Sequence, residues 1–237
     1  MTVRIVPGEI AAKDTTARVV LPTVALPKFA PYERVAETIA RSARRLPLHK
    51  HQASEVLTYV IEGSGTYEVA DAPPESIAPG AARMLTAPSN GSHAINSGEG
   101  QTIRYFAVVA ALPAGGAGAT KVQSAQIRES PPQPDGSAVA RVAGPNGPLK
   151  SAAGLECDAV RFVEDGTSFR RVGHDHTLIC YALSGRGHVD SDSLEVGEAA
   201  VVTDASGIGL QGQAGFRAIL VRAPRMTASA KPTGSGV

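Results

Sequence analysis

Three of the six histidines in this chain have the types and spacing that chemistry at a metal ion requires. His49 and His51 are separated by one residue in the segment HKHQASEVLTYVIEG, which runs through β-branched residues to a glycine turn. Alternate residues of a β-strand share one face, so both imidazoles can hold the same ion. His93 follows a turn at Pro79 and Gly80. A strand that returns alongside the first would bring this third imidazole to the pair.

Three neutral imidazoles suit iron, zinc, copper or nickel far better than magnesium or calcium, which prefer oxygen ligands. We therefore expect one divalent metal ion at His49, His51 and His93. The competing interpretation is that these are surface histidines at strand ends, hydrated by water.

A second histidine pair, His174 and His176, lies in the later half of the chain. The pair is displaced relative to its glycine turn, and Leu210 stands at the spacing where a third ligand is expected. His188, just after the turn, is the remaining histidine. We interpret these residues as loop histidines, and we expect the second half of the chain to bind no metal.

The chain contains two unequal copies of one unit. Residues 58–65, TYVIEGSG, are echoed by residues 180–187, CYALSGRG, and each half closes with a similar apolar strand at residues 104–113 and 217–224. A repeated unit of this kind predicts two similar domains. With 25 glycines, 17 prolines, no tryptophan and short β-branched runs between turn clusters, the composition is typical of an all-β protein.

This order of parts resembles the cupin superfamily, in which a small β-barrel carries His-x-His and an acid on one strand and a third histidine on a later strand. Among cupins with two barrels, it is most similar to the pirin family, whose metal strand reads His-Pro-His-x-Gly-Phe-Glu-Thr-Val-Thr-Tyr-Val-Leu-Glu-Gly. The matching residues here are His49, His51, Glu55, Thr58, Tyr59, Val60, Glu62 and Gly63. Residues 141–148 also resemble the segment that opens the second, metal-free pirin barrel, and the likeness covers most of residues 45–224.

The resemblance implies an all-β bicupin built from two cupin-type double-stranded β-helix barrels. We expect a metal-binding N-terminal barrel at residues 1–113, a linker at 114–136, a metal-free C-terminal barrel at 137–224 and a mobile tail at 225–237. Residues 32–45 fit either a short helix or a strand that continues into the histidine pair.

One position departs from the pirin pattern. In pirins a glutamate two residues after the third histidine completes the metal site, whereas Ile95 stands there in this chain. Glu55 is the obvious substitute if the strand alternates without a break from His51. It would otherwise orient an imidazole or form a salt bridge at the barrel mouth. A three-histidine site with open positions is still chemically complete.

The resemblance further implies a metal-dependent dioxygenase of quercetinase type, acting on a small polyphenol or enol. Iron is the favoured metal, with nickel, copper, manganese and zinc as alternatives. Glu55 and Tyr59 are the candidate catalytic residues, and we expect an apolar cup formed by Leu57, Tyr59, Met84 and Tyr105.

Two other functions remain open. One is a non-enzymatic regulatory protein whose partner surface responds to the state of the metal. The other is a metal-dependent lyase or isomerase with zinc or manganese, in which Tyr59 or Glu55 carries the proton.

Composition and charge limit the binding partners and the cellular location that we expect. A formal net charge of +1 shows no electrostatic footprint for nucleic acid or an anionic membrane, and leaves a protein partner open. No signal segment or membrane-length apolar run occurs, which predicts a cytoplasmic protein. Cys157 and Cys180 are expected to be buried thiols. The basic cluster Arg41, Arg44 and Arg45 has two interpretations, a solvent-exposed face or a gate for an anionic substrate.

Overall fold

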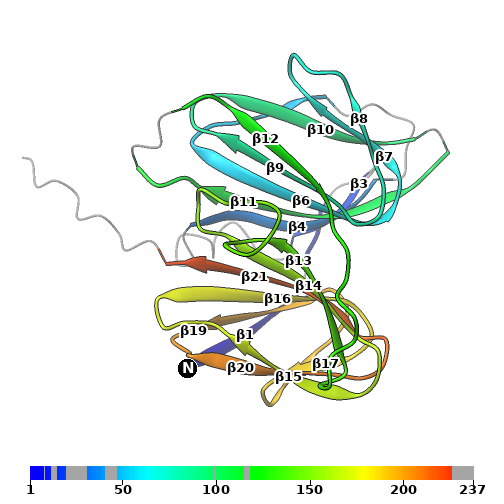
Figure 1. Cartoon of the computed structure of the whole chain (residues 1–237), viewed down its shortest axis with the longest axis vertical. Coiled ribbons are helices and arrows are strands. Elements are labelled where there is room, and N and C mark those ends of the chain that lie inside the picture. Colours follow the sequence, from blue (N-terminus) through cyan, green and yellow to red (C-terminus); the bar gives the residue numbers. More distant parts are fainter. Residues whose placement is uncertain are drawn as a thin grey trace, which may run out of the picture.

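The computed structural model of the chain describes residues 1–7, 9–11, 15–19, 31–40, 47–98, 100–114 and 118–225, and every regular element in them is a β-strand. Figure 1 shows the strands arranged as two stacked barrels. The all-β, two-barrel fold is therefore confirmed. No helix that could cross a membrane occurs in the described part of the chain.

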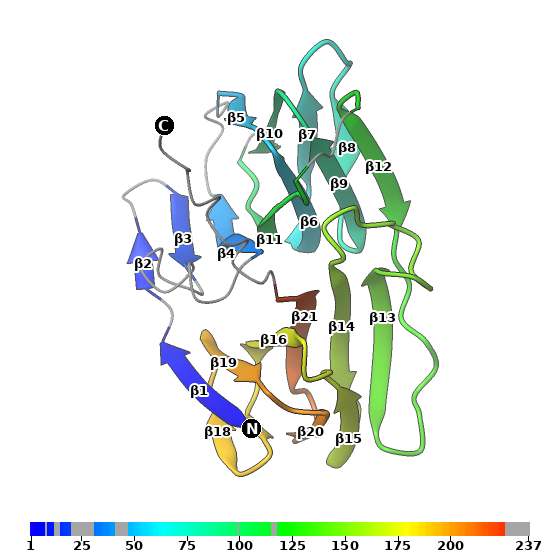
Figure 2. The same cartoon turned by 90° about the vertical axis from the view of Figure 1, so that its left-hand side faces the viewer.

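The first barrel is a seven-stranded sheet that faces a four-stranded sheet. The larger sheet has the order β12(Lys121–Gln126), β9(Ala81–Ala87), β6(Ser54–Gly63), β11(Ile103–Ala111), β4(Tyr32–Ala40), β3(Thr15–Val19), β2(Glu9–Ala11). The smaller sheet has the order β5(His49–His51), β10(Gly91–Ser97), β7(Gly65–Val69), β8(Glu75–Ile77). In Figure 2, β5 and β10 lie toward the end of this barrel that is remote from the second barrel.

The second barrel repeats this plan with a six-stranded and a four-stranded sheet. The larger sheet has the order β1(Thr2–Pro7), β19(Glu198–Thr203), β16(His176–Ser184), β21(Arg217–Pro224), β14(Glu156–Phe162), β13(Ser137–Ala143). The smaller sheet has the order β15(Gly166–Arg171), β20(Gly207–Gly212), β17(Gly187–Val189), β18(Asp192–Leu194).

The barrels exchange chain at their edges, which differs from the division expected from the sequence. β1 belongs to the second barrel, where it pairs antiparallel with β19. β12, inside the expected linker at residues 114–136, pairs with β9 and extends the first barrel. Short strands do not carry in their own sequence the identity of the sheet edge that they cover. Most of the expected mobile tail, residues 226–237, lies outside the described residues. The basic cluster Arg41, Arg44 and Arg45 lies outside them as well.

Strand β4 decides between the helix and the strand that the sequence allowed before the histidine pair. Residues 32–40 form a strand between β3 and β11, with Val35 opposite Val108. The strand interpretation is right over these residues, and residues 41–46 lie outside the described part.

β6 is buried on both faces from Ser54 to Ile61. Val56 and Val60 belong to the apolar clusters inside the first barrel. Leu57 and Tyr59 point the other way, into a cluster shared with the second barrel. This double burial explains why the segment reads as a continuous apolar run rather than as alternating apolar and polar residues.

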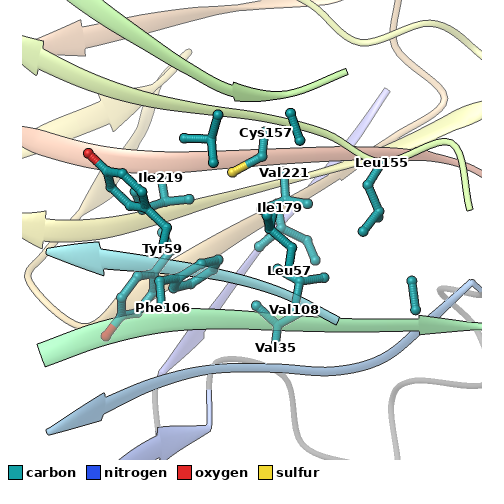
Figure 3. Packing of buried hydrophobic residues seen from close by; sticks show 14 of the residues in the cluster. Val35, Leu57, Tyr59, Phe106, Val108, Leu155, Cys157, Ile179, Ile219 and Val221 are labelled. Atoms are coloured by element: carbon teal, nitrogen blue, oxygen red, sulfur yellow. The ribbon is translucent and has the colours of Figure 1, made fainter. Parts of the chain in front are cut away.

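The interface between the barrels is packed like a protein core. Figure 3 shows Leu57, Tyr59 and Phe106 of the first barrel facing Ile179 and Ile219 of the second. The described cluster also includes Tyr32, Val35, Ile61, Val108, Leu149, Leu155, Cys157, Tyr181, Leu183 and Val221. The rings of Phe106 and Tyr181 stack across the interface with centroids 5.6 Å apart. The two barrels are thus joined by buried apolar surface.

Polar groups at the edges of this cluster are also shared. The Tyr181 hydroxyl donates to a Glu37 carboxylate oxygen at 2.5 Å, and Arg104 forms an ion pair with the same carboxylate. The Tyr32 hydroxyl lies 3.0 Å from the carbonyl oxygen of Val221. The two tyrosine contacts cross from one barrel to the other, whereas Arg104 and Glu37 both belong to the first barrel. Each contact satisfies a buried polar atom.

Both cysteines are buried free thiols, as expected. Cys157 lies in the cluster between the barrels, and Cys180 lies inside the second barrel. Burial raises the pKa of the Cys180 thiol to about 12, so it packs as a small apolar side chain.

Replacing Phe106 by alanine should lower the free energy of unfolding by about 3–5 kcal/mol, because it leaves a cavity in a cluster that both barrels share. Phe169→Ala is the matched control, since that ring is 73% exposed and its loss should change stability by less than about 0.5 kcal/mol. Denaturant unfolding followed by circular dichroism measures both. Similar small losses in the two variants would show that the interface contributes little.

Candidate metal centre

Strand pairing brings the three predicted ligands together. β5 and β10 are antiparallel neighbours, and His93 lies directly opposite His49. His51 is two residues further along β5, on the same face and opposite Gly91. A Cβ atom at Gly91 would lie 2.7 Å from the Cβ of Ala87, so only glycine leaves the barrel wall undisturbed beside the histidines.

The geometry of the cluster fits a single ion. One nitrogen of each imidazole of His49, His51 and His93 lies within 4.8 Å of the corresponding atoms of the other two. The ring centroids of His49 and His93 are 4.2 Å apart, and those of His51 and His93 are 5.1 Å apart. In the part of the chain that the structure describes, no other group of three such side chains meets this criterion.

Three imidazole nitrogens of the cluster, on His51 and His93, lack a hydrogen-bond partner among the described residues. His93 is only 2% exposed, and neither of its ring nitrogens has a hydrogen-bond partner among the described residues. The buried Nε2 of His51 likewise has none. Buried polar atoms without partners are rare because they are costly. A divalent metal ion would bind one nitrogen of each ring, and the set of imidazole donors fits iron, nickel, copper or zinc.

The electrostatics keep the imidazoles neutral. Burial, together with the neighbouring His49 and His51, lowers the pKa of His93 to about 3. Burial, His49 and Arg34 lower the pKa of His51 to about 4. The pKa of His49 is lowered by burial and by Arg34. All three are therefore uncharged at neutral pH, which is the state that binds a metal.

A small apolar cluster of the larger sheet lies beside Gly91, the strand partner of His51. Val56, Leu85, Ala87 and Val109 form a small cluster on the inner face of β6, β9 and β11. They supply an apolar wall near the barrel mouth.

Arg34 and Tyr67 are two residues near the site that the sequence did not single out. Arg34 lies opposite Val109 on β4, and its positive charge acts on His49 and His51. The Tyr67 ring centroid is 5.3 Å from that of His93, and its hydroxyl has no partner among the described residues. Alternation would have indicated Arg34 only if residues 32–40 had been assigned firmly as a strand.

Glu55 lies on the opposite face of β6 from the barrel interior, contrary to its predicted roles. Its carboxylate accepts hydrogen bonds from the Thr86 hydroxyl at 2.9 Å and from the backbone N–H groups of Ala152 and Ala153 at 3.0 and 3.1 Å. The Ser151 hydroxyl donates to it as well. Glu55 therefore connects β6 to a loop of the second barrel and is neither a ligand nor a base at the metal centre.

The error comes from the connection between β5 and β6. Ala53 has a φ of 51°, and the chain bends there. Strict alternation counted from His51 therefore does not continue into β6, and Glu55 falls on the other face.

The predicted catalytic role of Tyr59 is also wrong, because this residue lies away from the histidines. It belongs to the apolar cluster between the barrels, together with Leu57 and Met84. Of the expected apolar cup, only Tyr105 packs against a cluster inside the first barrel. A strand buried on both faces offers no polar residues that mark which face is which.

Ile95 lies two residues after His93 on β10 and is 3% exposed. It packs inside the barrel with Val60, Tyr67 and Ile77. The position at which the pirin pattern has a carboxylate is therefore on the histidine face and is apolar here.

The second barrel carries different residues at the equivalent positions. The turn glycines Gly63 and Gly185 have φ values of 74° and 73°, and the strand pairs that follow them have the same arrangement in both barrels. Aligned in this way, the three histidine positions are taken by Arg170, Val172 and Ile208.

The other histidines do not replace them. His176 begins β16, and its Nδ1 lies 2.7 Å from an Asp175 carboxylate oxygen. His174 is exposed in the preceding turn, and Leu210 aligns with Ile95 rather than with His93. That the second barrel binds no metal stays a prediction.

No protein family and no curated protein matches the chain by sequence. Solved structures do match it. GK1651 from Geobacillus kaustophilus has a TM-score of 0.83 at 16% identity, over 93% of this chain and 94% of that one. The bacterial pirin YhhW from Escherichia coli, in complex with nickel(II), has a TM-score of 0.79 at 13% identity, over 95% and 100%. A quercetin 2,3-dioxygenase from Acinetobacter baumannii has a TM-score of 0.83 at 17% identity, over 94% and 79%.

These similarities show that the chain has the two-barrel fold of these structures. Its fold is that of the pirins, so the resemblance inferred from residues 49–63 is confirmed at the level of fold. At these identities the similarity establishes the fold and leaves the activity to be argued from the site.

Lowering the pH from about 7 to about 4.5 should reduce the free energy of unfolding of the metal-free protein. The reduction should be smaller in a metal-free variant that carries both His51→Gln and His93→Gln. The folded pKa values of about 4 and about 3 lie below the ordinary value of 6.5. As the pH falls below 6.5, the unfolded chain therefore binds protons that the folded chain excludes, and stability is lost progressively toward the folded pKa values. Denaturant unfolding at each pH tests this, and equal losses in both proteins would contradict it.

Ile95→Glu should make stability depend more strongly on metal. Without metal, the buried carboxylate should cost roughly 2–5 kcal/mol, because it replaces an apolar side chain inside the barrel. With metal, an anionic ligand beside His93 should recover much of this loss. Thermal melts with and without nickel(II) measure the difference, with Ile95→Gln as the uncharged control. A loss in Ile95→Glu that nickel does not reduce would show that position 95 cannot reach the ion.

Proposed function

We propose that this protein is a metal-dependent dioxygenase of quercetinase type, which binds one divalent ion, most favourably iron, at His49, His51 and His93. The observation that carries the proposal is the cluster of three neutral imidazoles, in which His93 is buried and nitrogens of His51 and His93 have no partner among the described residues. The similarity of the fold to a quercetin 2,3-dioxygenase and to a nickel-bound pirin supports the same chemistry. When bound, a redox-active ion would bring an oxygen-chelating substrate and dioxygen together.

The substrate class follows from the charges around the histidines. With Ile95 in place of a carboxylate, the cluster supplies three neutral ligands, and no carboxylate of the described residues joins them to offset the positive charge of the ion. Arg34 adds a second positive charge nearby. Opposite charge in a partly buried site strongly favours an anionic ligand. An ionised enol or catechol with two neighbouring oxygens meets this requirement.

The apolar wall favours a planar organic body on that ligand. Val56, Leu85 and Val109 are buried on the sheet that faces the histidines. A ring system can lie against them while its oxygen atoms point toward the imidazoles. A small polyphenol therefore suits the site better than an aliphatic acid or a sugar.

Neither Glu55 nor Tyr59 is placed to transfer a proton at the metal centre. Glu55 accepts four hydrogen bonds on the far side of β6, and Tyr59 packs between the barrels. We infer instead that the protein selects the substrate in its ionised form, with Arg34 stabilising the negative charge. The lyase or isomerase alternative required one of those two residues as acid or base, and so it loses its support.

The test is anaerobic binding of quercetin to the iron- or nickel-loaded protein, followed by dioxygen uptake and loss of the flavonol absorption band. His51→Ala should abolish binding and turnover. Arg34→Gln should weaken flavonol binding by about tenfold at neutral pH, because it removes one nearby charge. Arg186→Gln, on the second barrel, is the matched control and should leave binding unchanged.

A different outcome would favour a different class of protein. Retention of metal with neither flavonol binding nor oxygen uptake would contradict the dioxygenase proposal. It would support the alternative of a regulatory protein that binds a partner according to the state of its metal.

A further inference from the structure

A cavity of about 450 Å³ lies in the second barrel and has no part in the proposed metal chemistry. It is bounded by residues of β13, β14, β15, β16 and β21, all in the lower barrel of Figure 2. Buried Leu178 and Leu220 form its apolar floor. Phe169 at its edge is 73% exposed, which is unusual for a phenylalanine.

Arginines line the cavity in excess over acids. Arg141 and Arg222 are already neutralised there. Arg141 makes two contacts with Asp158, at 3.0 and 3.3 Å, and Arg222 forms an ion pair with Glu156. These two pairs use both of the carboxylates in the lining.

Two further arginines of the lining, Arg170 and Arg171, form no ion pair with any described residue. Arg170 donates to the Ser137 hydroxyl at 3.2 Å, and its buried Nε has no partner in the described structure. Asp158 and Asp135 attract it through space without an ion-pair contact. Burial lowers the pKa of the Arg170 guanidinium, which shows that its charge is poorly solvated. An anion in the cavity would offset that cost.

The position of Arg170 in the fold is also informative. It occupies the place on β15 that His49 occupies on β5. The second barrel therefore presents a guanidinium where the first presents an imidazole for a metal. Guanidinium groups pair with carboxylates through two parallel hydrogen bonds, which an ammonium group cannot match.

We propose that this cavity binds a small organic carboxylate, with Arg170 and Arg171 pairing with the carboxylate group and Phe169, Leu178 and Leu220 contacting its apolar body. Charged walls, an apolar floor and an exposed ring suit a molecule with one anionic end and one hydrophobic end. The proposal does not depend on the activity of the first barrel.

The test is calorimetric titration of the metal-loaded full chain with benzoate. Saturable binding of one benzoate is expected, weakened at least tenfold in Arg170→Gln and in Arg171→Gln. The second variant matters because Arg171 is exposed and its loss does not threaten folding. Arg161→Gln is the matched control, since Arg161 pairs with Glu129 outside the cavity. His51→Ala should also bind benzoate normally, which separates this site from the metal centre.

Phe169→Ala should weaken benzoate severalfold and leave inorganic phosphate unaffected. Absence of saturable benzoate binding would overturn the proposal. Benzoate binding that survives both arginine changes, or that disappears in His51→Ala, would also overturn it. Phosphate binding that is tighter than benzoate binding and insensitive to Phe169→Ala would replace the organic acid with a simple oxyanion.

Discussion

Burial of β6 on both of its faces is the constraint on which the rest of the structure depends. One face, with Val56 and Val60, closes the first barrel around the metal centre. The other face, with Leu57 and Tyr59, forms the core shared with the second barrel. Glu55 lies on that second face and connects to the backbone of residues 152 and 153. The barrel that holds the histidines is therefore supported from behind by the other barrel, which keeps their positions fixed.

The features that the sequence predicted are those that depend on local periodicity. His49 and His51 share a face because one residue separates them, and the repeated glycine turn indicated two barrels. Glu55 was misassigned because Ala53, with its φ of 51°, breaks the alternation between two strands. Arg34 was missed because its strand reaches the site only through pairing with β11. Such non-local placement follows from sheet topology, which residue spacing alone does not encode.

The two barrels show how one fold supports different chemistry at the same positions. The register of strand pairs is equivalent, yet His49 corresponds to Arg170 and His93 corresponds to Ile208. Neutral imidazoles favour a cation in the first barrel, whereas a guanidinium favours an anion in the second. We infer that the inner residues at one end of each barrel determine which ligand it binds, while the shared core keeps both barrels in the same form.

We propose that His49, His51 and His93 bind one metal ion without a carboxylate from the protein. A crystal structure of the nickel-loaded protein, with anomalous scattering recorded at the nickel edge, tests it most directly. We predict one anomalous peak per chain within about 2.0–2.3 Å of a nitrogen of each of the three imidazoles, with only water or a small ligand at the remaining positions. A peak elsewhere in the chain, or a carboxylate side chain bound to the ion, would contradict the account.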